Sequence, residues 1–269
     1  MNFELICKEV ESLVRQAGQF IQEAASQFRS GDIETKSENN FVSWVDKGAE
    51  QMLVEGLRKI LPGSGFIVEE STTTEEILEY TWIIDPLDGT TNFIHAVPIY
   101  CVSVGLMHKN VMVLGIILEV NSEECFYAWE GGGAWMNGKA IQVTKTETVK
   151  DSLLATGFPY YDYGRLEPFI ELLRYTMQNT HGIRRLGSAA ADLAWVACGR
   201  FDGFYEYGLS PWDVAAGIVI IREAGGVLSD FEGKDNYLFG KEIIATNPRI
   251  FKEFLEVVKT TLPHLDHER

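Results

Sequence analysis

The chain contains few cysteines. Its four cysteines, Cys7, Cys101, Cys125 and Cys198, lie far apart among 269 residues and form no CxxC motif. This spacing argues against a disulfide framework and favours free, buried thiols in a reducing compartment. We therefore expect a cytoplasmic protein.

Positive charge is also scarce. The sequence has 23 Lys and Arg residues against 39 Asp and Glu residues, which gives a formal charge of −16. Nucleic acids and anionic membranes attract basic surfaces, so this balance argues against both as partners. A small phosphate ester stays compatible, because bound divalent cations reverse the local sign of the field.

Long apolar runs and targeting signals are missing as well. The segment Met1–Leu5 lacks the basic and apolar regions of a signal peptide. The longest candidate for an apolar run, Val111–Val120, has the length of a strand rather than of a membrane span. Because we find no repeat, low-complexity stretch or linker, residues 1–269 are predicted to form one unit.

The first half of the sequence predicts two helices followed by strands. Apolar residues recur at spacings of three and four over Leu5–Phe28 and Val45–Ile60, which is typical of amphipathic helices. The polar stretch Thr35–Asn40 between them is predicted to be a loop. Strand-forming runs between Phe66 and Trp129 predict an antiparallel meander, which completes a first subdomain of about residues 1–145.

The second half alternates between strand and helix patterns from Leu153 onward, which indicates α/β architecture. Its last helix is predicted to begin at Asn247-Pro248, because Asn favours the N-cap and Pro the first turn. We expect this second subdomain, about residues 146–269, to be layered against the first.

The segment Trp82–Phe93 is the most informative part of the chain. There an apolar run ends in Asp85 and Asp88, and Gly89-Thr90-Thr91 follows at once. Two carboxylates this close repel each other unless a cation lies between them. A glycine and hydroxyls suit a loop whose backbone N–H groups bind an anion, so the pattern predicts a metal-assisted phosphate site.

Two further acidic positions lie at ends of predicted elements. Glu69-Glu70 follows a strand, and Asp213 lies in the first turn of a helix. Taken singly, each cluster has an ordinary interpretation: a solvated charge pair, a β-turn at Asp85–Gly89, or a helix cap. Taken together, carboxylates without His or Cys favour Mg²⁺ or Mn²⁺ over zinc.

The joint pattern of these motifs resembles the inositol monophosphatase family over nearly the whole chain. The resemblance rests on Val68–Ser71, Trp82–Phe93 and Pro211–Gly217, with weaker support from Phe41–Asp46 and Glu223–Gly226. It implies a five-layer αβαβα sandwich of the inositol monophosphatase and fructose-1,6-bisphosphatase type. It also implies a homodimer.

The resemblance implies a centre with two to three Mg²⁺ ions, which Mn²⁺ can replace. One ion is held by Glu69, Asp85 and the backbone carbonyl of Leu87. A second is held by Asp85, Asp88 and Asp213, and a third, weaker ion touches Glu69. Inhibition by lithium is expected from the resemblance alone.

The implied reaction is hydrolysis of myo-inositol monophosphate to inositol and phosphate. Glu69 and the Thr90 hydroxyl orient the attacking water, and Asp46 accepts a hydrogen bond from Thr90. Backbone N–H groups of Gly89 and Thr90 bind the phosphate. No protein nucleophile is required.

Substrate contacts are implied for Asp88, Ser188, Ala189 and Glu206, and Lys36 lies in a loop that can close over the site. Ordinary alternatives stay open: an exposed strand-end carboxylate for Glu206, an N-cap alone for Ser188, and a solvated lysine for Lys36.

Other substrates and a second class of function also stay open. The same metal centre serves removal of the 3′-phosphate from adenosine 3′,5′-bisphosphate and hydrolysis of fructose 1,6-bisphosphate. A non-catalytic regulator, for instance of the transcription machinery, would keep the fold and bind a partner. The Arg184-Arg185 pair could contact a substrate anion or a partner subunit, and we favour surface or interface salt bridges. His95 could lie at the mouth of the site, but we favour a surface or hydrogen-bonded polar residue, and Gly131–Gly138 is interpreted as a hairpin connection.

Overall fold

The computed structural model describes residues 1–28, 33–37, 40–73, 76–159 and 163–262, without the side chains of residues 33–37 and 40–42. Its helices are α1 (Phe3–Ala25), α2 (Trp44–Ile60), α3 (Thr90–Ile94), α4 (Leu166–Asn179), α5 (Ala189–Ala197), α6 (Pro211–Glu223) and α7 (Phe251–Thr261), with a 3-10 turn at Val149–Asp151. Its strands are β1 (Ile33–Ser37), β2 (Asn40–Ser43), β3 (Gly65–Val68), β4 (Tyr80–Asp88), β5 (Cys101–His108), β6 (Val111–Glu119), β7 (Glu124–Trp129), β8 (Ala134–Met136), β9 (Lys139–Ile141), β10 (Leu153–Thr156), β11 (Gly182–Arg184), β12 (Gly203–Tyr207), β13 (Val227–Ser229) and β14 (Glu242–Thr246).

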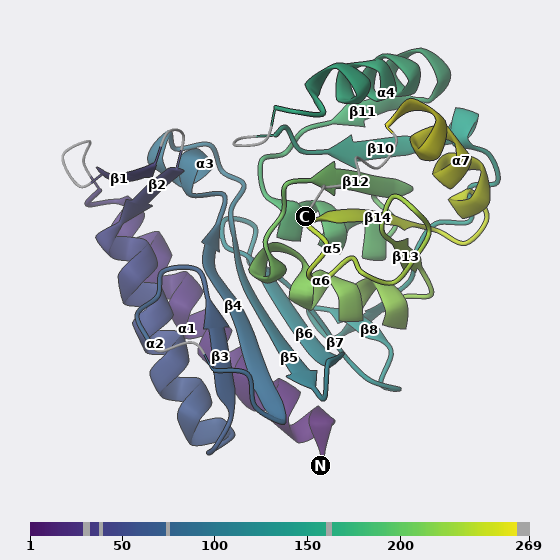
Figure 1. Cartoon of the computed structure of the whole chain (residues 1–269). Helices are drawn as coiled ribbons and strands as arrows, with labels where there is room; N and C mark the ends of the chain where they lie inside the picture. Colours follow the sequence, from purple (N-terminus) through teal and green to yellow (C-terminus); the bar gives the residue numbers. More distant parts are fainter. Residues whose placement is uncertain (29–32, 38–39, 74–75, 160–162, 263–269) are drawn as a thin grey trace.

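These elements stack in five layers (Figure 1). Helices α1 and α2 cover one face of a seven-stranded sheet, and α5 and α6 lie between that sheet and a five-stranded one. Helices α4 and α7 cover the far face of the second sheet. The predicted αβαβα sandwich is therefore confirmed.

The seven-stranded sheet has the order β3-β4-β5-β6-β7-β8-β9, and the five-stranded sheet has the order β11-β10-β12-β14-β13. The antiparallel meander is confirmed from β4 onward, but β3 pairs parallel to β4. Residues 65–141 make the first sheet and residues 153–246 the second. The subdomain boundary near residue 145 stays a prediction.

Glycines let helix α6 lie directly on the first sheet. A Cβ atom added to Gly115 on β6 would lie 2.2 Å from the Ala216 carbonyl oxygen, and one added to Gly105 on β5 would lie 3.0 Å from the Ala215 Cβ. Any larger side chain would push the helix away from these strands. The start of α6 is thereby fixed against the sheet.

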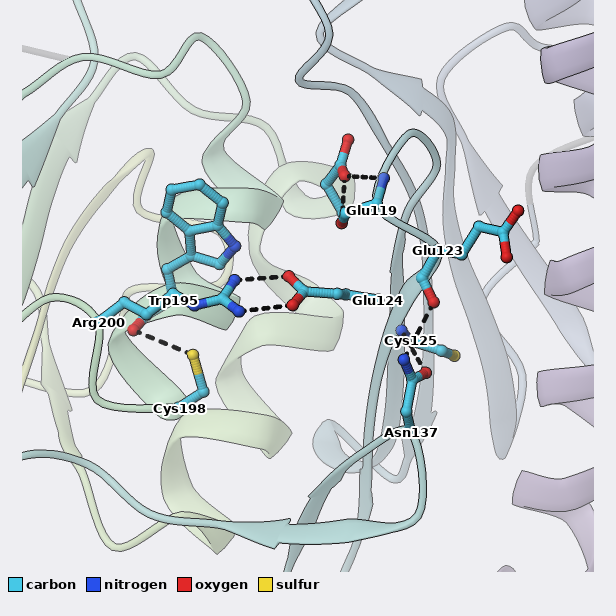
Figure 2. A network of polar contacts seen from close by, with 9 residues as sticks. Glu119, Glu123, Glu124, Cys125, Asn137, Trp195, Cys198 and Arg200 are labelled. Carbon is cyan, nitrogen blue, oxygen red and sulfur yellow. Dashed lines mark hydrogen bonds and ion pairs between the residues drawn. The ribbon is translucent and has the colours of Figure 1, made fainter.

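The C-terminal end of helix α5 is held to the first sheet by an ion pair (Figure 2). Arg200, just beyond α5, donates two hydrogen bonds of 2.5 Å to the carboxylate of Glu124 on β7. The same guanidinium lies 5.0 Å from the ring centroid of Trp195. A bidentate ion pair that also stacks on an aromatic ring fixes geometry better than a single surface contact does.

Two predicted elements are wrong in detail. Thr35–Ser37 lie on β1 and Asn40 begins β2, and these two strands pair antiparallel, so the described residues of the predicted loop are strand residues. The last helix begins at Phe251, because the Asn247 side chain accepts hydrogen bonds from the N–H groups of Arg249 and Ile250. That geometry closes a turn before the helix, so Asn247 caps the turn and not α7.

All four cysteines are free thiols, as expected; three are buried and Cys198 is half-buried. No helix among the described residues has the length and apolar character that crossing a membrane requires.

Candidate active site

Three carboxylates from two distant segments meet at one point. Asp85 and Asp88 come from the end of β4, and Asp213 comes from the first turn of α6. One oxygen atom from each lies within 4.8 Å of the others. Residues three apart in a regular strand point to opposite faces, so β4 needs a local irregularity to bring Asp85 and Asp88 together.

A β-bulge supplies that irregularity. Asp85 pairs with Ser103 and Asp88 pairs with Cys101, so two residues of β4 lie opposite a single residue of β5. The extra residue restores a common side for the two carboxylates. Pro86 fits in the bulge because it has no N–H group to donate to the ladder. The bulge therefore places both carboxylates of the Asp-Pro-Leu-Asp segment on the same side of β4, and the proline is compatible with it.

The backbone at Leu87 is held on both sides. Its N–H donates to Asp85 Oδ1 at 2.9 Å, and its carbonyl oxygen lies 3.0 Å from the Thr90 hydroxyl. The same hydroxyl lies 2.9 Å from Asp46 Oδ1. Thr90 therefore has two acceptors for one proton, and one of them is a carboxylate.

Asp46 is buried at the start of α2 and holds several groups at once. Its Oδ2 accepts hydrogen bonds from the Ser43 N–H at 2.8 Å and the Ser43 hydroxyl at 2.6 Å. Burial raises the pKa of Asp46, and the hydrogen bonds from Ser43 and Thr90 oppose that shift. The capping box of α2 thus connects this helix to the loop after β4.

Asp88 is tied to the start of α5. Its Oδ2 accepts hydrogen bonds from the Ser188 hydroxyl at 2.6 Å and the Ala190 N–H at 2.7 Å. Ser188 is the N-cap of α5, so the interpretation as a cap alone is wrong: the hydroxyl also donates to Asp88. Burial raises the pKa of Asp88 to about 6, against the lowering effect of these donors and of Arg185.

Asp213 is oriented by its own helix terminus. The predicted cap is confirmed: Ser210 is the N-cap, Pro211 follows it, and the Ser210 N–H donates to Asp213 Oδ2 at 2.7 Å. Burial first, and then the charge of Asp88, raise the pKa of Asp213 well above its usual range.

Asp85 experiences the strongest crowding of negative charge. Its side chain is 2% exposed, and burial raises its pKa well above the usual range, followed by the charges of Glu69, Asp88 and Asp213. Glu69, directly after β3, also lies within hydrogen-bonding reach of Asp85. Buried like charges of this kind are stable when a cation compensates them.

The donors of this cluster fit a hard divalent cation. Among the described residues, this cluster offers carboxylate oxygens and neither His nor Cys, which suits Mg²⁺ or Mn²⁺ and not zinc. Glu69 also lies beside Asp85, and the carbonyl oxygen of Leu87 accepts a hydrogen bond from the Thr90 hydroxyl. Their part in holding a cation stays a prediction of the family resemblance.

A cavity of about 190 Å³ opens beside the aspartates. Ser188 and Ala189 line one side, and Glu206, 9% exposed, lies on the end of β12. Burial and the charge of Asp88 raise the pKa of Glu206 to about 8. A Cβ atom on Gly157 would lie 1.9 Å from the Glu206 carboxylate, so this glycine makes room for it.

The remaining predicted residues divide between the cavity and the surface. Arg185 is half-buried and lines the cavity, with its guanidinium 5.3 Å from the Phe158 ring centroid, so its predicted alternative, contact with a substrate anion, stays open. Arg184 and His95 are exposed, as expected. Lys36 lies on β1, and its side chain lies outside the described residues.

Glu50 on α2 was not predicted as a site residue. Its buried carboxylate accepts hydrogen bonds from the Glu70 N–H at 2.7 Å, the Thr72 N–H at 2.8 Å and the Thr72 hydroxyl at 2.7 Å. It therefore holds the segment that carries Glu69 against α2. The available signal was its position one helical turn after Asp46, on the buried side of an amphipathic helix.

The substitution Glu50→Gln is expected to weaken divalent cation binding by roughly tenfold, as losses around a metal site commonly do. Glutamine keeps one acceptor oxygen but places an NH₂ group against backbone donors, which loosens the Glu69 segment. Calorimetric titration with Mg²⁺ measures the change. Glu55→Gln, an exposed position on the same helix, is the control, and equal affinity in both variants would contradict the role of Glu50.

The metal-free protein is expected to lose stability as the pH rises from about 5 to 8. The folded state keeps a proton on Asp88 until the pH passes its pKa of about 6, and on Glu206 until the pH passes its pKa of about 8, whereas the unfolded chain releases both protons near pH 4. Mg²⁺ should therefore raise the melting temperature more at pH 8 than at pH 6. A melting temperature that rises with pH in a chelator would contradict this.

Comparison with known proteins agrees with this geometry. The model of the inositol monophosphatase family matches residues 4–261. An inositol-1-monophosphatase from Mesorhizobium japonicum is 39% identical over 91% of this chain and 93% of its own length. A putative Nus factor SuhB from Neisseria meningitidis serogroup B is 39% identical over 91% of this chain and 94% of its own length. The inositol monophosphatase structure from Anabaena superimposes with a TM-score of 0.86 at 34% identity, covering 98% of both chains. This chain belongs to the inositol monophosphatase family.

Proposed function

We propose that the protein is a Mg²⁺-dependent phosphomonoesterase whose leading substrate is myo-inositol monophosphate. The observation that carries the proposal is the placement of Asp85, Asp88 and Asp213 within 4.8 Å of one another, beside a cavity lined by Glu206. The cluster would hold the cations, with Glu69 and the Leu87 carbonyl, and the cavity would receive the alcohol part of the ester.

Thr90, Asp46 and Glu69 would orient the attacking water. When the Thr90 proton lies toward Asp46 Oδ1, 2.9 Å away, the hydroxyl oxygen offers a lone pair to a water proton. Glu69, which lies beside Asp85, would offer a second acceptor, and two fixed acceptors would orient the water for attack on phosphorus. Bound Mg²⁺ supplies compensation of the phosphate charge and a lower pKa for water.

Gly89 and Thr90 would bind the phosphate through backbone N–H groups. Gly89 has a positive φ of 97°, which glycine adopts at little cost. A Cβ atom there would lie 3.1 Å from the Ile99 carbonyl oxygen and 3.2 Å from that of Gly187. The bare backbone therefore keeps the loop after β4 close to the start of α5, where Ser188 lies.

The charge of the cavity favours a neutral alcohol over a second phosphate. Glu206 and Asp88 would accept hydrogen bonds from hydroxyl groups, whereas an additional phosphate would lie among acidic side chains, four of which line the cavity with Glu206: Glu69, Asp88, Asp192 and Asp213. Among the described residues that line the cavity, Arg185 alone carries a positive charge. This balance supports inositol monophosphate over adenosine 3′,5′-bisphosphate and fructose 1,6-bisphosphate.

A second candidate function comes from the relatives. Proteins named inositol-1-monophosphatase and Nus factor SuhB match this chain at the same 39% identity, so names do not choose between catalysis and a regulatory role. The complete acidic cluster supports catalysis, with or without a second role. Phosphate release from inositol, nucleotide and sugar phosphates, with and without Mg²⁺, separates the classes, since a pure regulator releases none. The homodimer and the cytoplasmic location stay predictions.

Replacing Asp88 or Asp213 by Asn is expected to lower phosphate release by more than about 100-fold, because each change removes a charged donor from the cluster. Phosphate release at saturating Mg²⁺ measures the effect, and circular dichroism checks the fold. Asp151→Asn, at an exposed 3-10 turn, is the matched control. Wild-type rates in both site variants would contradict the proposal.

Replacing Glu206 by Gln is expected to lower kcat/KM for inositol monophosphate about tenfold more than kcat/KM for an aryl phosphate. The aryl group has no ring hydroxyl that could donate a hydrogen bond to Glu206. The loss in kcat/KM should therefore depend on the leaving group. Parallel kinetics on the two substrates give the ratio. If both substrates lose the same factor, Glu206 has no part in recognising the alcohol.

A further inference from the structure

Asp192 on α5 is a buried carboxylate that the proposed mechanism does not use. Its side chain is 1% exposed, and it belongs to the wall of the same cavity as Asp88 and Glu206. Its Oδ1 atom is buried and has no hydrogen-bond partner among the described residues. A buried oxygen that accepts no hydrogen bond lowers the free energy of unfolding, so a role outside the stability of the fold is indicated.

Buried aspartates that serve the fold accept hydrogen bonds from backbone groups. Asp230 accepts from the N–H groups of Glu232 and Lys234 at 3.0 and 2.7 Å. Asp202 accepts from the Leu153 N–H at 2.7 Å. Asp192 makes no such contact in the described part of the chain, so stabilising a turn or a helix end does not account for it.

The position of Asp192 on its helix places it in the cavity. It follows Ser188, the N-cap of α5, by four residues, and side chains four apart lie on one face of a helix. Ser188 already donates its hydroxyl proton to Asp88 at 2.6 Å. Asp192 therefore lies one helical turn beyond Ser188 on the face of α5 that lines the cavity.

The charged groups that act on Asp192 are mostly negative, and Arg185 is the cation among them. Glu206 and Asp88 repel its charge, while Arg185 attracts it. Leu209 and Trp212 add apolar surface to the same cavity. A ligand that fits must bring hydrogen-bond donors without negative charge, and a C–H face that packs on apolar side chains. A ring carrying several hydroxyl groups meets both conditions.

We propose that Asp192 determines specificity by accepting a hydrogen bond from a second ring hydroxyl of the alcohol, beside the hydroxyl that Glu206 binds. This inference rests on the proposed phosphatase function. It assigns two separate acceptors to the leaving group: Glu206 from the end of β12 and Asp192 from α5. Two fixed acceptors on different elements read the relative positions of two hydroxyls, which one acceptor alone does not.

The test compares Asp192→Asn with the wild type on myo-inositol monophosphate and on an aryl phosphate. Asparagine keeps the volume but removes the charge, and kcat/KM for the inositol ester should fall about tenfold more than kcat/KM for the aryl ester. Most of the change should lie in KM. Equal losses on both substrates, or no loss, would overturn the inference.

The control is Asp202→Asn. Asp202 is also a buried aspartate with an Oδ1 atom that lacks a partner in the described structure, but it is not part of the cavity wall. Any general loss of stability should therefore affect both substrates alike in this variant. A shift in substrate ratio as large as that of Asp192→Asn would attribute the effect to destabilisation and sink the proposal.

Wild-type protein provides a test that does not depend on a variant that folds. Deoxy analogues of inositol monophosphate, each lacking one hydroxyl, should reveal two different hydroxyls whose loss raises KM. A single sensitive hydroxyl would contradict the two-acceptor assignment.

Calorimetry with free myo-inositol separates this inference from the phosphatase proposal, because binding requires no turnover. If no ester releases phosphate while inositol still binds and Asp192→Asn weakens it, the phosphatase proposal fails and the role of Asp192 stands. If esters are hydrolysed but inositol binds both proteins equally, only the inference about Asp192 fails.

Discussion

The burial of several carboxylates at one point is the constraint on which the rest of the structure depends. Two unit charges about 5 Å apart repel by roughly 3 kcal/mol at an effective dielectric constant of ~20, and three aspartates form three such pairs. A chain without external restraint would turn these side chains apart. The fold has to hold them in place, and it does so mainly through backbone hydrogen bonds.

Each aspartate is held by a different local device. The Leu87 N–H holds Asp85, the start of α5 holds Asp88, and the Ser210 N–H holds Asp213. Bulge, N-cap and capping box are short-range features, yet they meet because α6 lies directly on β5 and β6 over glycines. Exchanging one such glycine would therefore disturb the site through the position of a helix and not through a lost ligand.

Sequence reasoning finds the residues whose signal is local and misses those whose partners are distant. In the Asp-Pro-Leu-Asp-Gly-Thr segment and at the Ser-Pro-Trp-Asp helix start, neighbouring residues determine the local backbone structure. The positions of the aspartates could therefore be predicted from the sequence. Glu50 contacts a loop 20 to 22 residues away, and Asp192 gains meaning only from a cavity that other elements enclose. Asn247 misled the prediction because a turn and a helix N-terminus use the same side-chain acceptor.

Helix α5 shows how a remote contact bears on the site. Its N-terminus presents Ser188 to Asp88, and Arg200 beyond its C-terminus holds Glu124 on β7 (Figure 2). Anchors at both ends fix the rotation of the helix about its axis as well as its position. Because that rotation decides whether Asp192 lies in the cavity wall, the ion pair at the far end helps to keep this side chain beside Asp88 and Glu206.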